Sequence, residues 1–363
     1  MKLNNKALWP LIGAVAVVGA LLLLWQSGGQ HRQGATGKQS GPAGRPQQTA
    51  EIEKGRSDPA KAVKKTPRTS NEYFERGNKR RQAGDYRGAI ADYTAVIKTD
   101  PSLSEAYRNR GIARLALGDA TKALKDFTKT IELGPPSARN YTNRGLARQE
   151  LGDVPGAIED HTKAISMEPL FSTAYFNRGN AHMQEPKLAA AMQDYTQAVE
   201  IDPAYAAAYH NRGKAREALG DLDAAFTDYE RAIAADPNDA LAYRSCGLAL
   251  VKKGAFAQAI RDFNRAIELK PNAADLHYNR GVALHLTADI AGAIRDYSRA
   301  IELDSRFAMA YFNRARLLTA KGELNAALGD ARTSLTLASE GRPSSREVRE
   351  LIELIRRREA KLP

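Results

Sequence analysis

An asparagine followed by an arginine, two side chains that can each form several hydrogen bonds, recurs through most of this sequence. The stretch "AYFNRGNA" (174–181) shows the pair in its usual setting. The asparagine stands at six places, Asn109, Asn143, Asn177, Asn211, Asn279 and Asn313. A side-chain amide can donate to a peptide C=O and accept from a peptide N–H. A column of such amides is therefore suited to hold the backbone of an extended peptide.

The arginine of the pair has a matching series of aspartates. The arginines are Arg76, Arg110, Arg144, Arg178, Arg212, Arg280 and Arg314, and the aspartates are Asp92, Asp126, Asp160, Asp194, Asp228, Asp262, Asp296 and Asp330. A guanidinium binds a carboxylate through two parallel hydrogen bonds. We therefore predict structural Arg–Asp bridges, within a repeat or between neighbours. Cys246 takes the place of one arginine, so Asp262 is predicted to mark a weak point or to borrow another partner.

The elements that carry these side chains follow from a period of 34 residues between 70 and 341. Each period holds two stretches with apolar residues three and four apart, which is helical spacing. Turns such as "LGDA" (117–120) separate them, and there glycine can end the first helix while Asp119 or, in a later repeat, Asp221 caps the second. Small residues recur where two helices must approach closely. The fourth period has "EPKL" (185–188) instead, which predicts an altered loop.

This pattern resembles the tetratricopeptide repeat. The match covers eight units, at 70–103, 104–137, 138–171, 172–205, 206–239, 240–273, 274–307 and 308–341. The resemblance implies an all-α fold, a right-handed α-solenoid superhelix of helix–turn–helix repeats whose first helices line a concave groove. Related arrays bind peptides or proteins there without catalysis. By the same resemblance the asparagine column faces the groove; alternatively, each asparagine bonds the neighbouring repeat and only stiffens the stack.

Specificity is expected from groove positions that differ between repeats. The candidates are Arg108, Phe176, His210, Arg244, Tyr278 and Phe312. This mixture of aromatic and basic groups suits a peptide with acidic and apolar side chains. Chaperone-binding repeats hold a terminal carboxylate with a lysine and an asparagine one turn apart. The corresponding pairs here are Phe74–Asn78 and Phe176–Asn180, without lysine, so we do not predict that site.

The N-terminal residues differ from the repeats in composition. Residues 9–25 carry no charge and are just long enough to cross a bilayer, which predicts a transmembrane helix or signal anchor after a short cytoplasmic N-terminus at 1–8. Residues 26–69 are rich in Gly, Pro, Gln, Ser and Lys and predict a disordered basic linker. The protein would then be a single-pass protein of a bacterial inner membrane with periplasmic repeats; a cleaved signal and a secreted or periplasmic protein is the alternative.

The C-terminus predicts one more helix, at 344–362. Ser344 and Glu347 have capping-box spacing. An apolar stripe follows, formed by Val348, Leu351, Ile352 and Ile355. A helix that covers the last repeat and shows a polar face to water is what a repeat array needs for solubility.

No motif for catalysis, a cofactor or a metal is found in the sequence, although His277 and His285 are two helical turns apart. We therefore predict a non-enzymatic, membrane-anchored scaffold that binds a protein or extended peptide in its groove to assemble a membrane or envelope complex. Alternatives are a regulatory or substrate-recruiting subunit of a separately encoded enzyme and an anionic-surface binder acting through the basic linker. No nucleic acid is expected, and the sequence indicates neither the ligand's identity nor an oligomeric state.

Overall fold

The computed structural model describes residues 69–185, 187–338 and 343–361, and every regular element in them is an α-helix. These residues divide into two compact units, and the boundary along the chain lies between Ala235 and Asp236. We call them the N-terminal unit and the C-terminal unit. The prediction of an all-helical fold is confirmed for this part of the chain.

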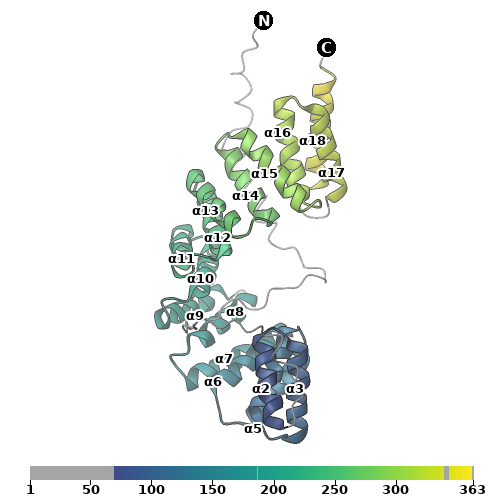
Figure 1. The fold of residues 1–363 in the computed structure, drawn as a ribbon. Coiled ribbons are helices and arrows are strands. Elements are labelled where there is room, and N and C mark those ends of the chain that lie inside the picture. Colours follow the sequence, from purple (N-terminus) through teal and green to yellow (C-terminus); the bar gives the residue numbers. More distant parts are fainter. Residues whose placement is uncertain (1–68, 186, 339–342, 362–363) are drawn as a thin grey trace, which may run out of the picture. The chain divides into compact units, whose positions relative to one another are not determined.

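The N-terminal unit holds five helix pairs (Figure 1). The pairs are α2 (Ser70–Gln82) with α3 (Tyr86–Thr99), α4 (Ser104–Ala116) with α5 (Ala120–Leu133), α6 (Ala138–Glu150) with α7 (Val154–Met167), α8 (Ser172–Gln184) with α9 (Leu188–Ile201), and α10 (Ala206–Ala218) with α11 (Leu222–Ala235). Each pair falls within one predicted repeat, and in the first four pairs the second helix packs against the first helix of the next pair.

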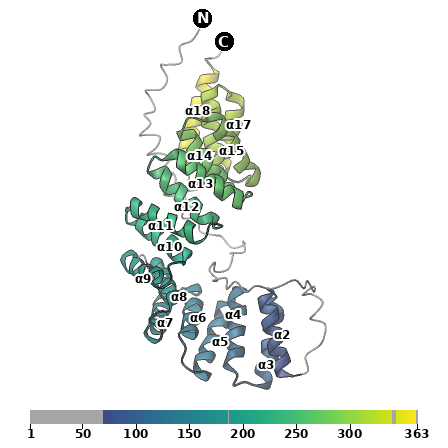
Figure 2. The same cartoon turned by 60° about the vertical axis from the view of Figure 1, so that its left-hand side comes forward.

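The C-terminal unit holds three further pairs and a final helix. These are α12 (Ala240–Lys252) with α13 (Phe256–Leu269), α14 (Ala274–Leu286) with α15 (Ile290–Leu303), α16 (Ala308–Lys321) with α17 (Leu324–Leu337), and α18 (Ser345–Glu359). Figure 2 shows this succession from a second direction. We number the pairs as repeats 1 to 8 along the chain.

The turn inside repeats 1, 2, 3 and 5 is made by a glycine and an aspartate, as predicted. Gly118 has a φ of 79°, a left-handed conformation that glycine adopts without steric cost. Asp119 then caps α5 by accepting a hydrogen bond from the backbone N–H of Lys122 at 3.2 Å, and Asp221 caps α11 in the same way. Repeat 7 differs, because Ala288 occupies the left-handed position with a φ of 64°.

In seven of the eight repeats, a glycine of the first helix lies against an aromatic ring of the second helix. A methyl group placed on Gly111 would stand 2.7 Å from Cε1 of Phe127, which is closer than real contacts allow. The same relation holds in repeats 1 to 7, with His161 as the ring in repeat 3. Repeat 8 has Ala315 instead of glycine, and there the ring is replaced by Ala331. The two positions therefore change together.

Helix α18 packs onto the last repeat. Ser344 and Glu347 form the predicted capping box. The stripe of Val348, Leu351 and Ile352, together with Ile355, is buried against residues of α16 and α17. The guanidinium of Arg358 also donates to the backbone carbonyl of Thr319 at 2.9 Å.

The predicted localisation has to be corrected. In the part of the chain that the structure describes, no helix combines the length and apolar character needed to cross a membrane, so a single-pass membrane protein is not supported. The predicted segments at 1–8, 9–25 and 26–69 lie outside the described residues, apart from Thr69, which caps α2. The right-handed superhelix stays a prediction.

Candidate peptide-binding site

The first helices of successive repeats touch one another on one side of the N-terminal unit. Helix α2 contacts α4, α4 contacts α6, α6 contacts α8 and α8 contacts α10, whereas the second helices lie farther apart. In the C-terminal unit α12 contacts α14 in the same way. Side chains on this face of the first helices therefore form continuous rows across several repeats, and we call this face the first-helix face.

The Arg–Asp bridges are confirmed, and they lie within a repeat. In repeat 5, Arg212 donates through Nε and Nη2 to the two carboxylate oxygens of Asp228 at 2.9 and 2.7 Å. Bridges of the same form occur in the other six repeats that carry the arginine. The hydrogen bonds to Asp160 raise the pKa of the Arg144 guanidinium. Cys246, at the position without arginine, is buried.

The same arginines also connect neighbouring repeats. Nη1 of Arg212 donates to the hydroxyl of Thr196 in the preceding repeat at 3.2 Å, and Nη1 of Arg110 does so to Thr94. The Arg212 guanidinium lies 5.5 Å from the centre of the Tyr209 ring. Arg110 and Arg212 are each fixed by an aspartate, an aromatic ring and the preceding repeat, so their role is to hold the repeats in register.

Two of the predicted asparagines form amide pairs with a residue of the preceding repeat. Nδ2 of Asn109 donates to Oδ1 of Asn78 at 3.0 Å, and Nδ2 of Asn211 donates to Oδ1 of Asn180 at 2.8 Å. In the first pair, Oδ1 of Asn78 also accepts a hydrogen bond from the hydroxyl of Tyr93, in the second helix of its repeat. The asparagine thus bonds the neighbouring repeat, which was the alternative left open by the sequence.

The amide pairs keep polar atoms available. Within the described residues, the amide nitrogen of Asn78 and the carbonyl oxygen of Asn109 have no protein partner, and neither is a buried atom. The nitrogen of Asn180 and the oxygen of Asn211 are in the same state. Each pair therefore offers a donor and an acceptor on the first-helix face.

The other four predicted asparagines form no amide pair among the described residues. Asn177 and Asn279 are each 6% exposed, whereas Asn143 is partly buried. Asn313 is almost wholly buried, and its Nδ2 donates to the hydroxyl of Tyr278 at 3.0 Å. The six asparagines do not form one uniformly exposed column.

Aromatic residues at the variable positions stack on rings of their own repeat. Phe176 lies 5.9 Å from Tyr195 and 4.9 Å from Tyr205, measured between ring centres. Tyr278 has corresponding neighbours in repeat 7, Tyr297 at 5.7 Å and Phe307 at 4.8 Å. These rings form two apolar clusters, one in each unit.

The remaining variable positions differ in what they can offer to a ligand. His210 is buried against the Tyr229 ring, and Phe312 is 6% exposed. Arg244 forms an ion pair with Asp275 of the next repeat at 3.0 Å. Arg108 is partly buried, and no ion pair to it occurs among the described residues. Of these four residues, Arg108 is the cation available to a ligand.

Sequence reasoning did not place several residues in the site. In the sequence, Asn78 and Asn180 stood out only as parts of a possible carboxylate site. Their pairing with another amide depends on the burial of each side chain, which the sequence does not show. Tyr205 and Phe307 end their repeats, where the sequence signalled only a loop. Their identical spacing from Phe176 and Tyr278 could have indicated the clusters.

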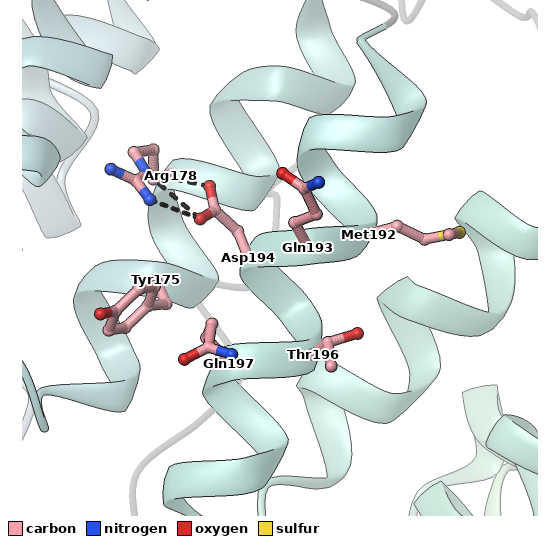
Figure 3. A pocket seen from close by; sticks show the side chains of 7 residues that line it. All are labelled: Tyr175, Arg178, Met192, Gln193, Asp194, Thr196 and Gln197. Carbon is pink, nitrogen blue, oxygen red and sulfur yellow. Dashed lines mark hydrogen bonds and ion pairs between the residues drawn. The ribbon is translucent and has the colours of Figure 1, made fainter.

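A cavity of about 430 Å³ lies in repeat 4, between α8 and α9. Figure 3 shows Tyr175 and Arg178 on one side, and Met192 with two glutamines along α9. The guanidinium of Arg178 is bound to Asp194, so the charge in this cavity is already neutralised. None of the predicted groove residues lines it.

The described residues contain no cluster of three or more His, Cys, Asp or Glu side chains placed to hold a metal ion. Burial and the charge of Arg316 lower the pKa of His285 to about 4, and burial lowers the pKa of His161 to about 3. Both imidazoles are therefore neutral at neutral pH.

Family models of the tetratricopeptide repeat match two parts of the sequence. One matches residues 184–220, 218–254 and 247–287, and a second matches residues 74–138. A search of curated proteins gave no significant match.

Solved structures show the same fold at low sequence identity. The hetero-tetramer Cut9–Hcn1 of the APC/C is 18% identical, with a TM-score of 0.53 over 79% of this chain, which spans 56% of that one. The C-terminal part of a repeat protein from Cytophaga hutchinsonii is 14% identical, with a TM-score of 0.50 over 65% of this chain and 97% of that one.

The 17 helices of the described residues, the recurring glycine–ring contacts and the matching models agree in period and position. Proteins with such repeats generally mediate protein or peptide binding and scaffolding and are typically not enzymes. The chain contains tetratricopeptide repeats.

Proposed function

We infer that this protein is a scaffold that holds an extended segment of a partner protein along the first-helix face and so assembles a multiprotein complex. The observation that carries this inference is the repeated amide pair. Each pair offers an N–H donor and a carbonyl acceptor side by side. The C=O of a bound peptide can accept from the donor, and a peptide N–H can donate to the acceptor.

The surroundings of the pairs support a peptide ligand. Phe74 and Phe176 lie one helical turn before Asn78 and Asn180, and each ring stacks on a tyrosine of its repeat. Apolar and aromatic surface beside a few placed polar groups is the usual composition of a binding site. The two pairs are three repeats apart, so one long segment is needed to reach both.

The amide pairs favour contact with the ligand backbone, because every residue of a peptide presents the same N–H and C=O groups. Sequence preference would then come from variable residues such as Arg108 and Phe176. A scaffold with this division can accept several related segments, with affinity from the backbone contacts and selectivity from the side chains.

The test uses the full chain and peptides selected from a random 12-residue display library. The variants are Asn109→Ala and Asn211→Ala, and Asn325→Ala, on the exposed surface of α17, is the matched control. We expect each groove variant to weaken binding about tenfold, as for loss of a hydrogen bond to a peptide group, while the control binds as the unaltered protein does.

Urea unfolding of the same variants separates binding from stability. If Asn109→Ala and Asn211→Ala lower the unfolding midpoint while the folded protein keeps its peptide affinity, the amides only stiffen the stack. The proposed function would then lose the observation on which it rests.

A further inference from the structure

The polar tip of the ring in the second helix usually has a partner. The hydroxyl of Tyr93 donates to Asn78 at 2.9 Å, and that of Tyr229 donates to Oε2 of Glu217 at 2.6 Å. In repeat 3, Nε2 of His161 lies 3.1 Å from Oε1 of Gln149. Repeat 7 is different, because the Tyr297 ring is wholly buried and its hydroxyl has no hydrogen-bond partner among the described residues.

Two more unpartnered polar atoms belong to residues near Tyr297. Asn313 is 1% exposed, and its Oδ1 has no partner, although its Nδ2 is bonded to Tyr278. Nδ1 of His285 is also buried without a partner. Buried polar groups in folded proteins are nearly always hydrogen-bonded. A group supplied from outside the protein would satisfy these atoms.

The cluster also contains an unneutralised cation. The guanidinium of Arg316 lies 5.8 Å from the centre of the Phe312 ring and is partly buried. No carboxylate of the described residues lies within ion-pair distance of it, whereas Arg280 and Arg314 in the same repeats are each bound by an aspartate. Arg316 and Asn313 stand three residues apart on α16, which places them on one side of the helix. Asn313 is bonded to Tyr278, and the Tyr278 ring centre lies 5.7 Å from that of Tyr297.

We propose that Arg316, Tyr297 and Asn313 form a subsite for an acidic residue of the bound peptide. The guanidinium and the tyrosine hydroxyl donate hydrogen bonds to the carboxylate of the ligand side chain, and Oδ1 of Asn313 accepts the peptide N–H of the same ligand residue. This subsite lies wholly in the C-terminal unit. It rests on the proposed function, because it assigns one position of the peptide that the first-helix face binds.

The position of Arg316 supports this assignment. It stands in repeat 8 at the place that Asn78 and Asn180 occupy in repeats 1 and 4, so it lies on the corresponding face of its own repeat. Asn313 likewise corresponds to Asn109 and Asn211. No amide pair forms here, because Val282 of repeat 7 stands at the place of Asn78 and Asn180. The side chain on α16 beside the Asn313 amide is instead the Arg316 guanidinium, and its complementary ligand group carries a negative charge.

The test follows the Nε–H resonance of Arg316 by NMR in the full chain. The probes are N-acetyl-glutamate N-methylamide and its neutral analogue N-acetyl-glutamine N-methylamide. The resonance is assigned by its loss in Arg316→Gln. We expect a saturable shift with the glutamate probe, with an apparent affinity about tenfold above that of the glutamine probe.

Further variants separate the subsite from general charge effects. Tyr297→Phe removes only the hydroxyl and is expected to lower the affinity for the glutamate probe about tenfold. Arg295→Gln, on the exposed side of α15, is the matched control and should leave the titration unchanged. The assignment would be overturned if the resonance responded equally to both probes, or if it responded to inorganic phosphate but not to the glutamate probe. It would also be overturned by a crystal structure in which the probe is absent and a water is bonded to Tyr297 and Asn313.

Failure here is distinguishable from failure of the proposed function. If selected peptides lose affinity in Asn109→Ala and Asn211→Ala but bind Arg316→Gln as the unaltered protein, the scaffold function stands and the acidic subsite does not.

Discussion

The glycine–ring contact in repeat 2 leads to a quantitative prediction for Gly111→Ala. In an exposed helix interior this change would stabilise the protein by about 1 kcal/mol, because alanine has the higher helix propensity. At Gly111, however, the added methyl group would stand 2.7 Å from Cε1 of Phe127, which is wholly buried. The ring must therefore move within a packed core.

The two effects oppose each other, and the contact decides the sign. Overpacking of a core costs about 1–3 kcal/mol, so we expect a net loss of about 1 kcal/mol for Gly111→Ala. In a Phe127→Ala background the obstacle is gone, and the same change should stabilise the protein by about 1 kcal/mol. The coupling between the two sites should therefore be about 2 kcal/mol. Phe127→Ala alone should cost about 3–5 kcal/mol through its cavity.

The assay is urea unfolding of the four proteins of this double-mutant cycle, followed by circular dichroism. Repeat 8 supplies the control, because it already pairs Ala315 with Ala331 and has no ring to obstruct a methyl group. Ala315→Gly should cost about 1 kcal/mol by propensity alone. The reasoning is refuted if Gly111→Ala stabilises the unaltered protein as much as it stabilises the Phe127→Ala variant.

Three further predictions concern single positions. Ala288→Gly should stabilise the protein by about 1 kcal/mol in urea unfolding, because alanine is strained at the φ of 64° found there. Asp228→Asn should cost about 3–5 kcal/mol in the same assay, because it leaves the buried Arg212 charge unpaired. Burial lowers the pKa of His161 from an ordinary value of 6.5 to about 3. The unfolded chain therefore binds a proton that the folded protein does not, and stability should fall by up to about 1.4 kcal/mol per pH unit below pH 6.5; urea midpoints at several pH values should show a shallower fall for His161→Phe.

The helix pairs and their contacts could be predicted from the sequence because each depends on a residue type that recurs at a fixed interval. Asp119 and Asp221 cap their helices as expected, since a cap requires only a nearby backbone N–H. The Arg–Asp bridges could be predicted for a similar reason. Both residues recur together, and a guanidinium beside a buried carboxylate forms hydrogen bonds to it in one preferred two-bond geometry.

The hydrogen-bond partners of the asparagines could not be predicted in the same way. Asn109 and Asn211 pair with Asn78 and Asn180, which occur in only two repeats, so the period does not reveal the partner. Asn313 stands at the same place in its repeat but bonds Tyr278, because repeat 7 has valine where the other pairs have an asparagine. Which bond forms depends on side chains one repeat away.

This distribution of partners indicates where ligand specificity can reside. The N–H groups of Arg212 donate hydrogen bonds to Asp228 and Thr196. Replacing Arg212 would therefore disturb the packing of the repeats and not only the preference for a ligand. Residues such as Arg108 and Arg316 have no ion pair among the described residues and can change without loss of a structural bond. A protein built on one repeated frame can therefore acquire a new ligand by substitutions at these positions, while the bridges keep the spacing along the first-helix face constant.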